Sequence, residues 1–406
     1  MTEKSAIHIL IVDDDPLILK LLSRMLVNQG FTPAATCDSG RAALEWMDGS
    51  GGQPDLILLD LNMPEMDGVE FVRHLVERRY TGSLILVSGE DERMLQTVAK
   101  LVEAHRISLL GHLHKPVTPE GLAASLGKWA PPSRSKPGAA KKTYDAEEVR
   151  AAITNGELVN YYQPKVEVAT GRVVGVEVLV RWQHPHDGMV FPGQFIGVAE
   201  AHGLIDDLTR VMMSSALAQA SRWQEMGLML QVSVNVSMDN LASLDFVDFV
   251  TKQAAATGVP PHQVVLEVTE SRLMRDLRTP LEILTRLRLK RFKLSIDDFG
   301  TGHSSLAQLR DIPFDELKID QSFVHGAWEN DTVRAMFDAS LGLAKQLNMG
   351  IVAEGVEDRT DWDFLRKTGC DVAQGYFIAK PMHAASLPGW MNSWRMRMQE
   401  EFPVAS

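Results

Sequence analysis

The sequence predicts two consecutive α/β domains, a doubly wound parallel sheet followed by a larger β/α barrel. Three observations support this prediction. The chain has 406 residues, which is more than one ordinary hydrophobic core accommodates. Short apolar segments alternate with amphipathic segments over most of its length. A stretch rich in proline, lysine and small residues, at positions 130–143, interrupts this alternation and has no periodicity of its own.

The first domain is expected over residues 1–130. Amphipathic segments such as residues 16–30, which end at Gly30, separate its strand candidates and are typical of helices. Alternation of strands and helices predicts a parallel sheet with its ligand site at the carboxyl ends of the strands. The four strand candidates are IHILIV, DLILLD, SLILVS and SLLGHL.

Residues 131–144 are expected to be a linker, and residues 145–400 a second domain. Eight strand candidates in this domain, most of them separated by helical patterns, match a β/α barrel. Catalytic groups in such barrels lie at the carboxyl ends of the strands. The candidates are YYQPKVEV, VVGVEVLVRW, LQVSVNVS, VVLEVTE, FKLSIDD, ELKIDQSF, GIVAEGVE and VAQGYFIA.

Composition narrows the class of protein. The chain is 45% hydrophobic and 23% charged, which indicates a folded globular protein. Its net charge of -12 argues against a nonspecific grip on DNA, which needs a basic surface. Only two cysteines are present, and no apolar run approaches the roughly 20 residues that span a bilayer. With no signal-peptide pattern at the start, we expect a cytoplasmic protein without a membrane span.

Acidic residues cluster at the predicted strand ends of the first domain. Asp13 and Asp14 end its first strand, Asp60 ends DLILLD, Ser88 ends SLILVS, and Lys115 follows the last strand. Because parallel strand ends converge, three carboxylates crowd one point and can bind Mg²⁺. A central carboxylate can then accept a phosphoryl group, with the lysine and the hydroxyl contacting its oxygens.

The segments IVDDDP, LLDLNMPEMDG, VSG and HKP make residues 1–130 similar to a response-regulator receiver domain, which has a flavodoxin-like fold. The resemblance implies that Asp60 is phosphorylated by a histidine kinase or phosphotransfer protein. Asp14 would bind Mg²⁺ with Asp13 nearby, and the Asn62 carbonyl would add a ligand. Ser88 and Lys115 would be the switch hydroxyl and lysine. His112 departs from the family, which usually has an aromatic switch residue there.

Acidic or amide side chains also mark one predicted strand after another in the second domain. Carboxylates are unexpected in apolar strands unless something gathers them, and hard oxygen ligands from separate strands are what a divalent cation requires. The pattern therefore predicts metal-dependent phosphate chemistry. The residues are Glu177, Asn235, Glu267, Asp297, Asp298 and Glu354, and Lys318 in ELKID joins them.

Residues 145–395 resemble the EAL domain, a family of cyclic di-GMP phosphodiesterases with a TIM-like barrel. The matching segments include EVLVRWQHP, EVTES, DDFGTGHSSL, AEGVE and AQGYFIAKP. The resemblance implies two Mg²⁺ or Mn²⁺ ions and hydrolysis to pGpG. Its implied roles are metal ligands for Glu177, Asn235, Glu267, Asp297 and Asp298, catalysis for Glu354 and Lys318, and substrate binding for Gln163, Arg181 and Gln374.

The resemblance also implies that Glu270 anchors the loop after Asp298, a loop that affects metal binding and subunit contacts, and it implies a homo-oligomer. Val178 and His303 depart from the family, in the signature triplet and in that loop, but neither is a metal ligand. Three alternatives stay open. The second domain could bind cyclic di-GMP without cleaving it, the first could bind Mg²⁺ without being phosphorylated, or the first could serve as a dimerisation platform.

Overall fold

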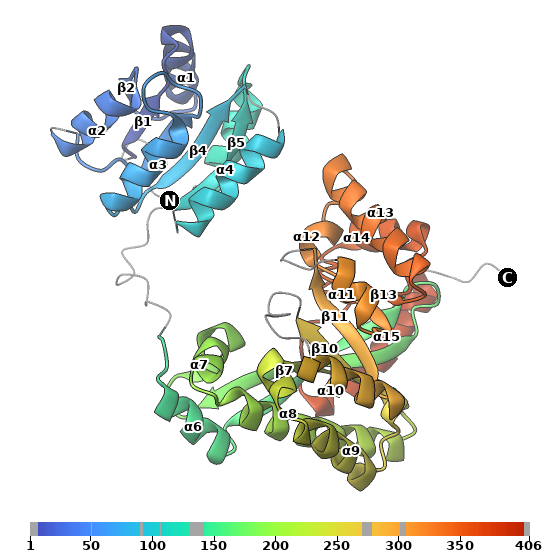
Figure 1. The fold of residues 1–406 in the computed structure, drawn as a ribbon. Helices are drawn as coiled ribbons and strands as arrows, with labels where there is room; N and C mark the ends of the chain where they lie inside the picture. Colours follow the sequence, from blue (N-terminus) through green and yellow to red (C-terminus); the bar gives the residue numbers. More distant parts are fainter. Residues whose placement is uncertain are drawn as a thin grey trace. The chain divides into compact units, whose positions relative to one another are not determined.

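The computed structural model describes residues 7–49, 51–89, 92–105, 107–129, 142–269, 278–300 and 306–401. The chain forms two compact units, residues 1–139 and 140–406 (Figure 1). Most of the predicted linker, residues 131–144, lies outside the described residues. Each helix in the described part of the chain is too short or too polar to cross a membrane.

The first unit contains a five-stranded parallel sheet in the order β2-β1-β3-β4-β5, as predicted for a doubly wound domain. Two apolar clusters, one on each face, bury the sheet. Its strands are β1 (Ile9–Val12), β2 (Ala35–Cys37), β3 (Leu56–Asp60), β4 (Ser83–Ser88) and β5 (Ser108–His114). Its helices are α1 (Pro16–Asn28), α2 (Gly40–Asp48), α3 (Gly68–Glu77), α4 (Glu92–Ala104) and α5 (Pro119–Leu126).

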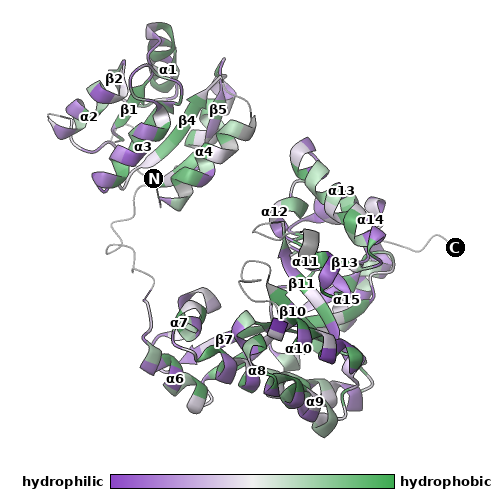
Figure 2. Ribbon diagram, viewed as in Figure 1, coloured by the Kyte–Doolittle hydropathy of each residue, from purple (hydrophilic) through white to green (hydrophobic). Residues whose placement is uncertain are grey.

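Strand β2 was missed by sequence reasoning, because three residues at a sheet edge are too few to show a period. The buried central strands were recognisable as continuous apolar runs. In Figure 2, β4 is mostly green, whereas α2 and α3 alternate between purple and green. These colours are typical of a sheet buried on both faces by amphipathic helices.

The second unit is a closed eight-stranded barrel, which confirms the predicted β/α barrel. The strands follow the order β6-β14-β13-β12-β11-β10-β9-β7, and pairing between β6 and β7 closes the ring. A short strand, β8 (Gly188–Val190), pairs with β7 outside the ring. The barrel strands are β6 (Leu158–Glu167), β7 (Val173–His184), β9 (Gln231–Val236), β10 (Val264–Thr269), β11 (Lys293–Phe299), β12 (Glu316–Ile319), β13 (Gly350–Ala353) and β14 (Val372–Ala373).

Strand β6 runs antiparallel to both of its neighbours, unlike the other strands of the ring. The reason is the short connection between β6 and β7, where the amide of Gly171 donates to the carbonyl of Glu167. A turn this short joins antiparallel strands, since a parallel pair needs a crossover of a dozen or more residues. Gly171 adopts a φ of +72°, which suits glycine in such a turn.

Helices cover the outside of the barrel, and one large apolar cluster lies between helices and strands. Side-chain caps begin several of them. Asp145 and Glu148 form a capping box at α6, and Asp358 accepts from two amides at the start of α14. The α-helices are α6 (Ala146–Thr154), α7 (Ile196–Ala201), α8 (Ile205–Glu225), α9 (Asp245–Thr257), α10 (Arg278–Leu289), α11 (Leu306–Asp311), α12 (Gln321–Val324), α13 (Asp331–Gln346), α14 (Arg359–Thr368) and α15 (Leu387–Glu401).

Candidate functional site

The acidic residues of the first unit meet at one edge of its sheet. Asp13 follows β1 and Asp60 ends β3, and both side chains are buried. Oxygens of Asp13, Asp14 and Asp60 lie within 4.8 Å of one another. The Lys115 ammonium lies 2.8 Å from Asp13 and 2.7 Å from Asp60. Burial raises the pKa of the Asp13 carboxyl, although the hydrogen bond from Lys115 opposes this shift.

The remaining predicted residues of this site lie around Asp60. The backbone N–H of Asn62 donates to Asp60 Oδ1 at 3.2 Å, which orients the carboxylate. Ser88 is fully buried at the end of β4, and the Lys115 amide donates to its carbonyl. His112 lies in β5, partly buried. The fold thus brings the predicted carboxylates, lysine and serine to one edge, and their chemical roles stay predictions.

In the barrel, strand register places the predicted ligands side by side. Glu177 on β7 pairs with Ser233 on β9, two residues before Asn235. Asn235 pairs with Glu267 on β10, and Asp297 on β11 pairs with Thr269, two residues after Glu267. Since these strands are parallel, their carboxyl ends point the same way, and one cluster of side chains forms at that end of the barrel.

A bulge lets both aspartates of β11 serve this cluster. Adjacent residues of a regular strand point to opposite faces. Between Ile296 and Phe299 the pairing of β11 with β12 shifts, and Asp298 adopts a φ of +52°, in the left-handed region. As a result, oxygens of Asp297, Asp298 and Glu354 come within 4.8 Å of one another.

Lys318 lies at the centre of the cluster and is 1% exposed. Its ammonium lies 3.0 Å from Glu267, 2.8 Å from Asp297 and 2.7 Å from Glu354, with Glu177 at 3.8 Å. Burial alone would lower the pKa of this lysine, but the surrounding carboxylates raise it well above its usual value. Lys318 is therefore a charged amine inside the barrel.

Two amide side chains hold Glu177, and a third holds one of them. Asn235 donates to Glu177 Oε1 at 3.0 Å, and Gln374 donates to Oε2 at 2.5 Å. Gln374 also donates to Gln163, which in turn donates to the carbonyl of Ala379 at 3.0 Å. Gln163 and Gln374, predicted to bind substrate, thus also orient the carboxylate of Glu177.

Sequence reasoning missed Lys165, a second buried lysine on β6. Its ammonium lies 3.0 Å from Ser233 Oγ, 3.2 Å from Glu267 and 2.9 Å from Glu316. Burial would raise the pKa of Glu267, but Lys318 and then Lys165 lower it to about 2. The available signal was a lysine two residues after Gln163 in YYQPKVEV, on the same face of the strand as a predicted site residue.

Negative charge exceeds positive charge in this cluster. Five carboxylates contact the two lysines, those of Glu177, Glu267, Asp297, Glu316 and Glu354, and Asp298 adds a sixth beside Asp297 and Glu354. Burial raises the pKa of Glu177, and it raises that of Glu354 to about 8, even though Lys318 opposes both shifts. Divalent cations would offset this excess, and the donors are the hard oxygens that Mg²⁺ and Mn²⁺ prefer. The residues present therefore fit such ions.

Two cavities adjoin the carboxylates, and both are lined by Glu177 and Asp298. One, of about 300 Å³, is also lined by Gln163, Glu354 and Gln374. The other, of about 370 Å³, extends over Asn235 and apolar side chains of β7, α7 and α8. The carboxylates of Glu177 and Asp298 thus border both cavities.

One predicted residue, Arg181, does not contact this cluster of carboxylates in the described part of the chain. Arg181 lies among aromatic rings, with its guanidinium 5.7 Å from the centre of Tyr161 and 5.1 Å from that of Phe191, and it does not line either cavity. Burial lowers its pKa. Glu270 and His303 lie outside the described residues. Val178, the departure in the signature triplet, is buried in the apolar cluster of the barrel.

Comparisons with known proteins match both units. The EAL domain model matches residues 146–381, and the response regulator receiver domain model matches residues 9–126. The chain is 33% identical over 382 residues to cyclic di-GMP phosphodiesterase RocR of Pseudomonas aeruginosa, a match that covers 93% of this chain and 96% of that protein.

Other relatives match the barrel alone. The bifunctional diguanylate cyclase/cyclic di-GMP phosphodiesterase MucR of P. aeruginosa is 39% identical over 241 residues, which are 59% of this chain and 35% of MucR. The solved structure of the PaMucR phosphodiesterase in its c-di-GMP complex has a TM-score of 0.57 and 39% identity, and the match covers 59% of this chain and 98% of that one.

Proposed function

Since the chain belongs to the EAL domain family and carries a response regulator receiver domain before the barrel, we propose that it hydrolyses cyclic di-GMP to linear pGpG. We propose further that phosphorylation of Asp60 modulates this activity. The observation that carries the proposal is the gathering of four carboxylates around buried Lys318, beside cavities that Glu177, Asp297, Asp298 and Glu354 help to line.

Two divalent cations are part of the proposal. Glu177, Asn235, Glu267 and Asp297 would hold the first, and Asp297 would share the second with Asp298 and Glu354. When bound, such ions lower the pKa of water and offset the negative charge of a phosphodiester. The closeness of Asp297, Asp298 and Glu354 supports the second group.

The chain's own residues would position water and substrate. Lys318, in contact with Asp297 and Glu354, would donate a hydrogen bond to the attacking water. Glu354, which lies 2.7 Å from Lys318, would accept its proton. The water oxygen bonds to phosphorus and the bond from phosphorus to the leaving ribose oxygen breaks. That oxygen takes a proton from solvent and leaves as a hydroxyl, and the ring opens. Arg181 would contact a phosphate.

A turnover assay tests the activity. Purified full-length protein is incubated with cyclic di-GMP and Mn²⁺ or Mg²⁺, and pGpG is quantified by chromatography. We expect pGpG from the native chain, none in excess EDTA, and none from Glu177→Ala or Glu354→Ala. Tight binding of cyclic di-GMP without pGpG would instead favour the receptor that does not cleave.

Regulation is tested separately. The donor to Asp60 would be a histidine kinase or a phosphotransfer protein, for which acetyl phosphate or beryllofluoride can substitute. We expect either reagent to change the turnover of the native chain and leave Asp60→Ala unaffected. Equal rates under all conditions would leave the first unit without this role. Light scattering with and without beryllofluoride tests the predicted homo-oligomer.

A further inference from the structure

The loop after β12 and the loop after β13 form adjoining walls of the smaller cavity. Asp320 and Gln321 contribute from the first loop, and Glu354, Gly355 and Glu357 contribute from the second. Both loops follow strands that carry site residues, because Lys318 lies in β12 and Glu354 follows β13. Whatever holds these loops together therefore also sets the shape of the proposed active site.

The short helix α12 lies between two glycines of the site loops. A Cβ atom built on Gly355 would come 2.2 Å from Cβ of Gln321. One built on Gly300, just after the two aspartates of β11, would come 2.5 Å from the Phe323 ring. Because not even a methyl group would fit at either glycine, α12 packs directly against both loops, and its position and theirs are linked.

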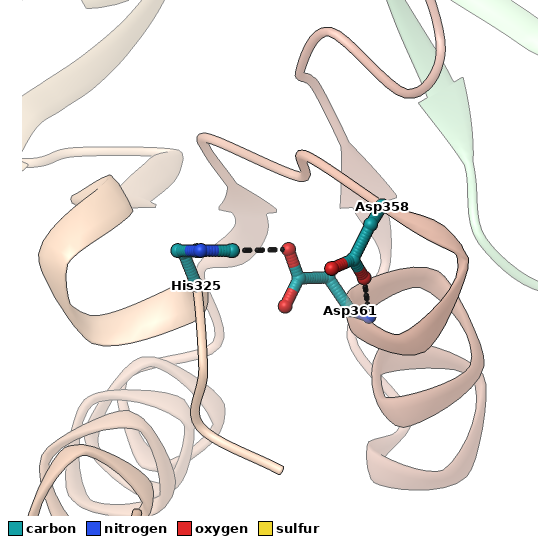
Figure 3. Close-up of side chains that lie close together, drawn as sticks. All are labelled: His325, Asp358 and Asp361. Atoms are coloured by element: carbon teal, nitrogen blue, oxygen red, sulfur yellow. Dashed lines mark hydrogen bonds and ion pairs between the residues drawn. The ribbon is translucent and has the colours of Figure 1, made fainter. Parts of the chain in front are cut away.

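The end of α12 is tied to α14 by a buried carboxylate. Asp361, in the first turn of α14, is 0% exposed. Figure 3 shows its contact with His325, whose Nδ1 lies 2.8 Å away. Asp361 also accepts backbone hydrogen bonds from Gly326 at 3.2 Å and Glu357 at 3.0 Å. One side chain thus binds the segment after β12 and the segment after β13 at once.

His325, Asp358 and Asp361 could also be considered as a metal site, because their ligand atoms lie within 4.8 Å of one another. Their hydrogen bonds argue otherwise. Both oxygens of Asp361 already accept from protein donors, and Asp358 Oδ1 accepts from the amides of Thr360 and Asp361. The hydrogen bond that His325 donates to the Asp361 carboxylate raises the pKa of His325, which favours the imidazolium in this pair.

We propose that His325 and Asp361 are positioning residues for the phosphodiesterase reaction. Their pair fastens α12 to the start of α14, and α12 in turn supports the loops that carry Asp298 and Glu354. Neither residue lines the cavity. This inference rests on the proposed hydrolysis of cyclic di-GMP, and its effect on the two loops can be measured without that activity.

The decisive comparison is between His325→Leu and His325→Asn in the full-length protein. Leucine removes the donor, whereas the asparagine amide can donate from nearly the position of Nδ1. We expect kcat/KM for cyclic di-GMP to fall about tenfold in His325→Leu, because small misplacements of reacting groups are costly. We expect the half-saturating Mn²⁺ concentration to rise, and His325→Asn to stay near the native values.

Hydrogen exchange gives a second readout. In His325→Leu, without metal or substrate, backbone amides of residues 320–326 and 354–358 should exchange faster, while the thermal midpoint stays close to native. Asp361→Asn should show the same defects, and combining it with His325→Leu should add little. Two matched controls are His262→Leu, just before β10, and Asp363→Asn, which removes an exposed ion pair on α14.

Several results would overturn the inference. One is that His325→Leu keeps the native kcat/KM and the native rates of hydrogen exchange. Another is that His325→Asn loses as much activity as His325→Leu. A third is that the control variants show the same losses. Stoichiometric Zn²⁺ binding that His325→Leu abolishes would assign the three residues to a metal instead. If the native chain makes no pGpG, the proposed function fails, and the exchange comparison still decides whether the pair holds the loops.

Discussion

Replacing Lys318 with methionine tests the charge balance of the barrel site. Methionine has a similar length and no charge, so the substitution keeps volume and removes the ammonium that lies within 3.0 Å of Glu267, Asp297 and Glu354. Without it, these buried carboxylates repel one another, and Lys165 still contacts Glu267. The folded state without metal should therefore lose stability.

The size of the loss follows from the buried ion pairs. Removing one partner of a buried pair costs about 3–5 kcal/mol. In a unit of this size, each kcal/mol lowers the thermal midpoint by about 2–4 °C, so a fall of about 6–20 °C is expected in EDTA. Mn²⁺ should restore much of this lost stability, because a free Mn²⁺ concentration of 100 times the dissociation constant stabilises the folded state by about 2.7 kcal/mol.

The assay is thermal unfolding of the full-length chain, followed by circular dichroism, in EDTA and in Mn²⁺. Mn²⁺ should raise the midpoint of Lys318→Met more than that of the native chain, since unbalanced carboxylates bind a cation more tightly. At saturating Mn²⁺, turnover should still fall about 10²–10⁴-fold because the attacking water loses its donor. Lys345→Met, an exposed lysine on α13, is the control. A midpoint in EDTA within 2 °C of native, or equal shifts with Mn²⁺, would refute the reasoning.

Three further outcomes are expected. In EDTA, burial raises the pKa of Glu354 to about 8, so the folded state holds a proton that the unfolded state releases. The free energy of unfolding, measured with urea, should therefore fall as the pH rises from about 5 to about 8. Gly375→Ala should lower both the thermal midpoint and kcat/KM several-fold, because a Cβ there would lie 2.2 Å from backbone atoms of Val356. In Asp60→Asn, Lys115 loses one of its two carboxylates, and phosphate incorporation from acetyl phosphate, followed by Phos-tag gel or mass spectrometry, should disappear.

Much of both sites could be predicted from local pattern. Asp13 and Asp60 follow apolar runs, as do Glu354 and Gln374, and the ends of parallel strands necessarily meet at one edge. Alternation of strands and helices likewise predicted a doubly wound sheet and a barrel, because periodicity reports which faces are buried. These inferences use only the order of residues that are close together in the sequence.

Other features depend on residues far apart in the chain. Strand β2 is too short to show a period, and β6 is antiparallel only because a tight turn returns it to β7. The partners of Lys165 lie on strands 68, 102 and 151 residues away. No local period reports contacts at such separations.

The sequence by itself determined which residue types end the strands, and hence that carboxylates and a lysine would share one end of the barrel. Only the tertiary structure decided how they are used. A shift in register between β11 and β12 turns the neighbouring Asp297 and Asp298 toward the same cluster, and the pair of His325 and Asp361 ties two loops whose residues are 36 positions apart. The physical reason is that pairing between distant strands and loops is set by closure of the barrel and by packing, which the local order of residues does not record.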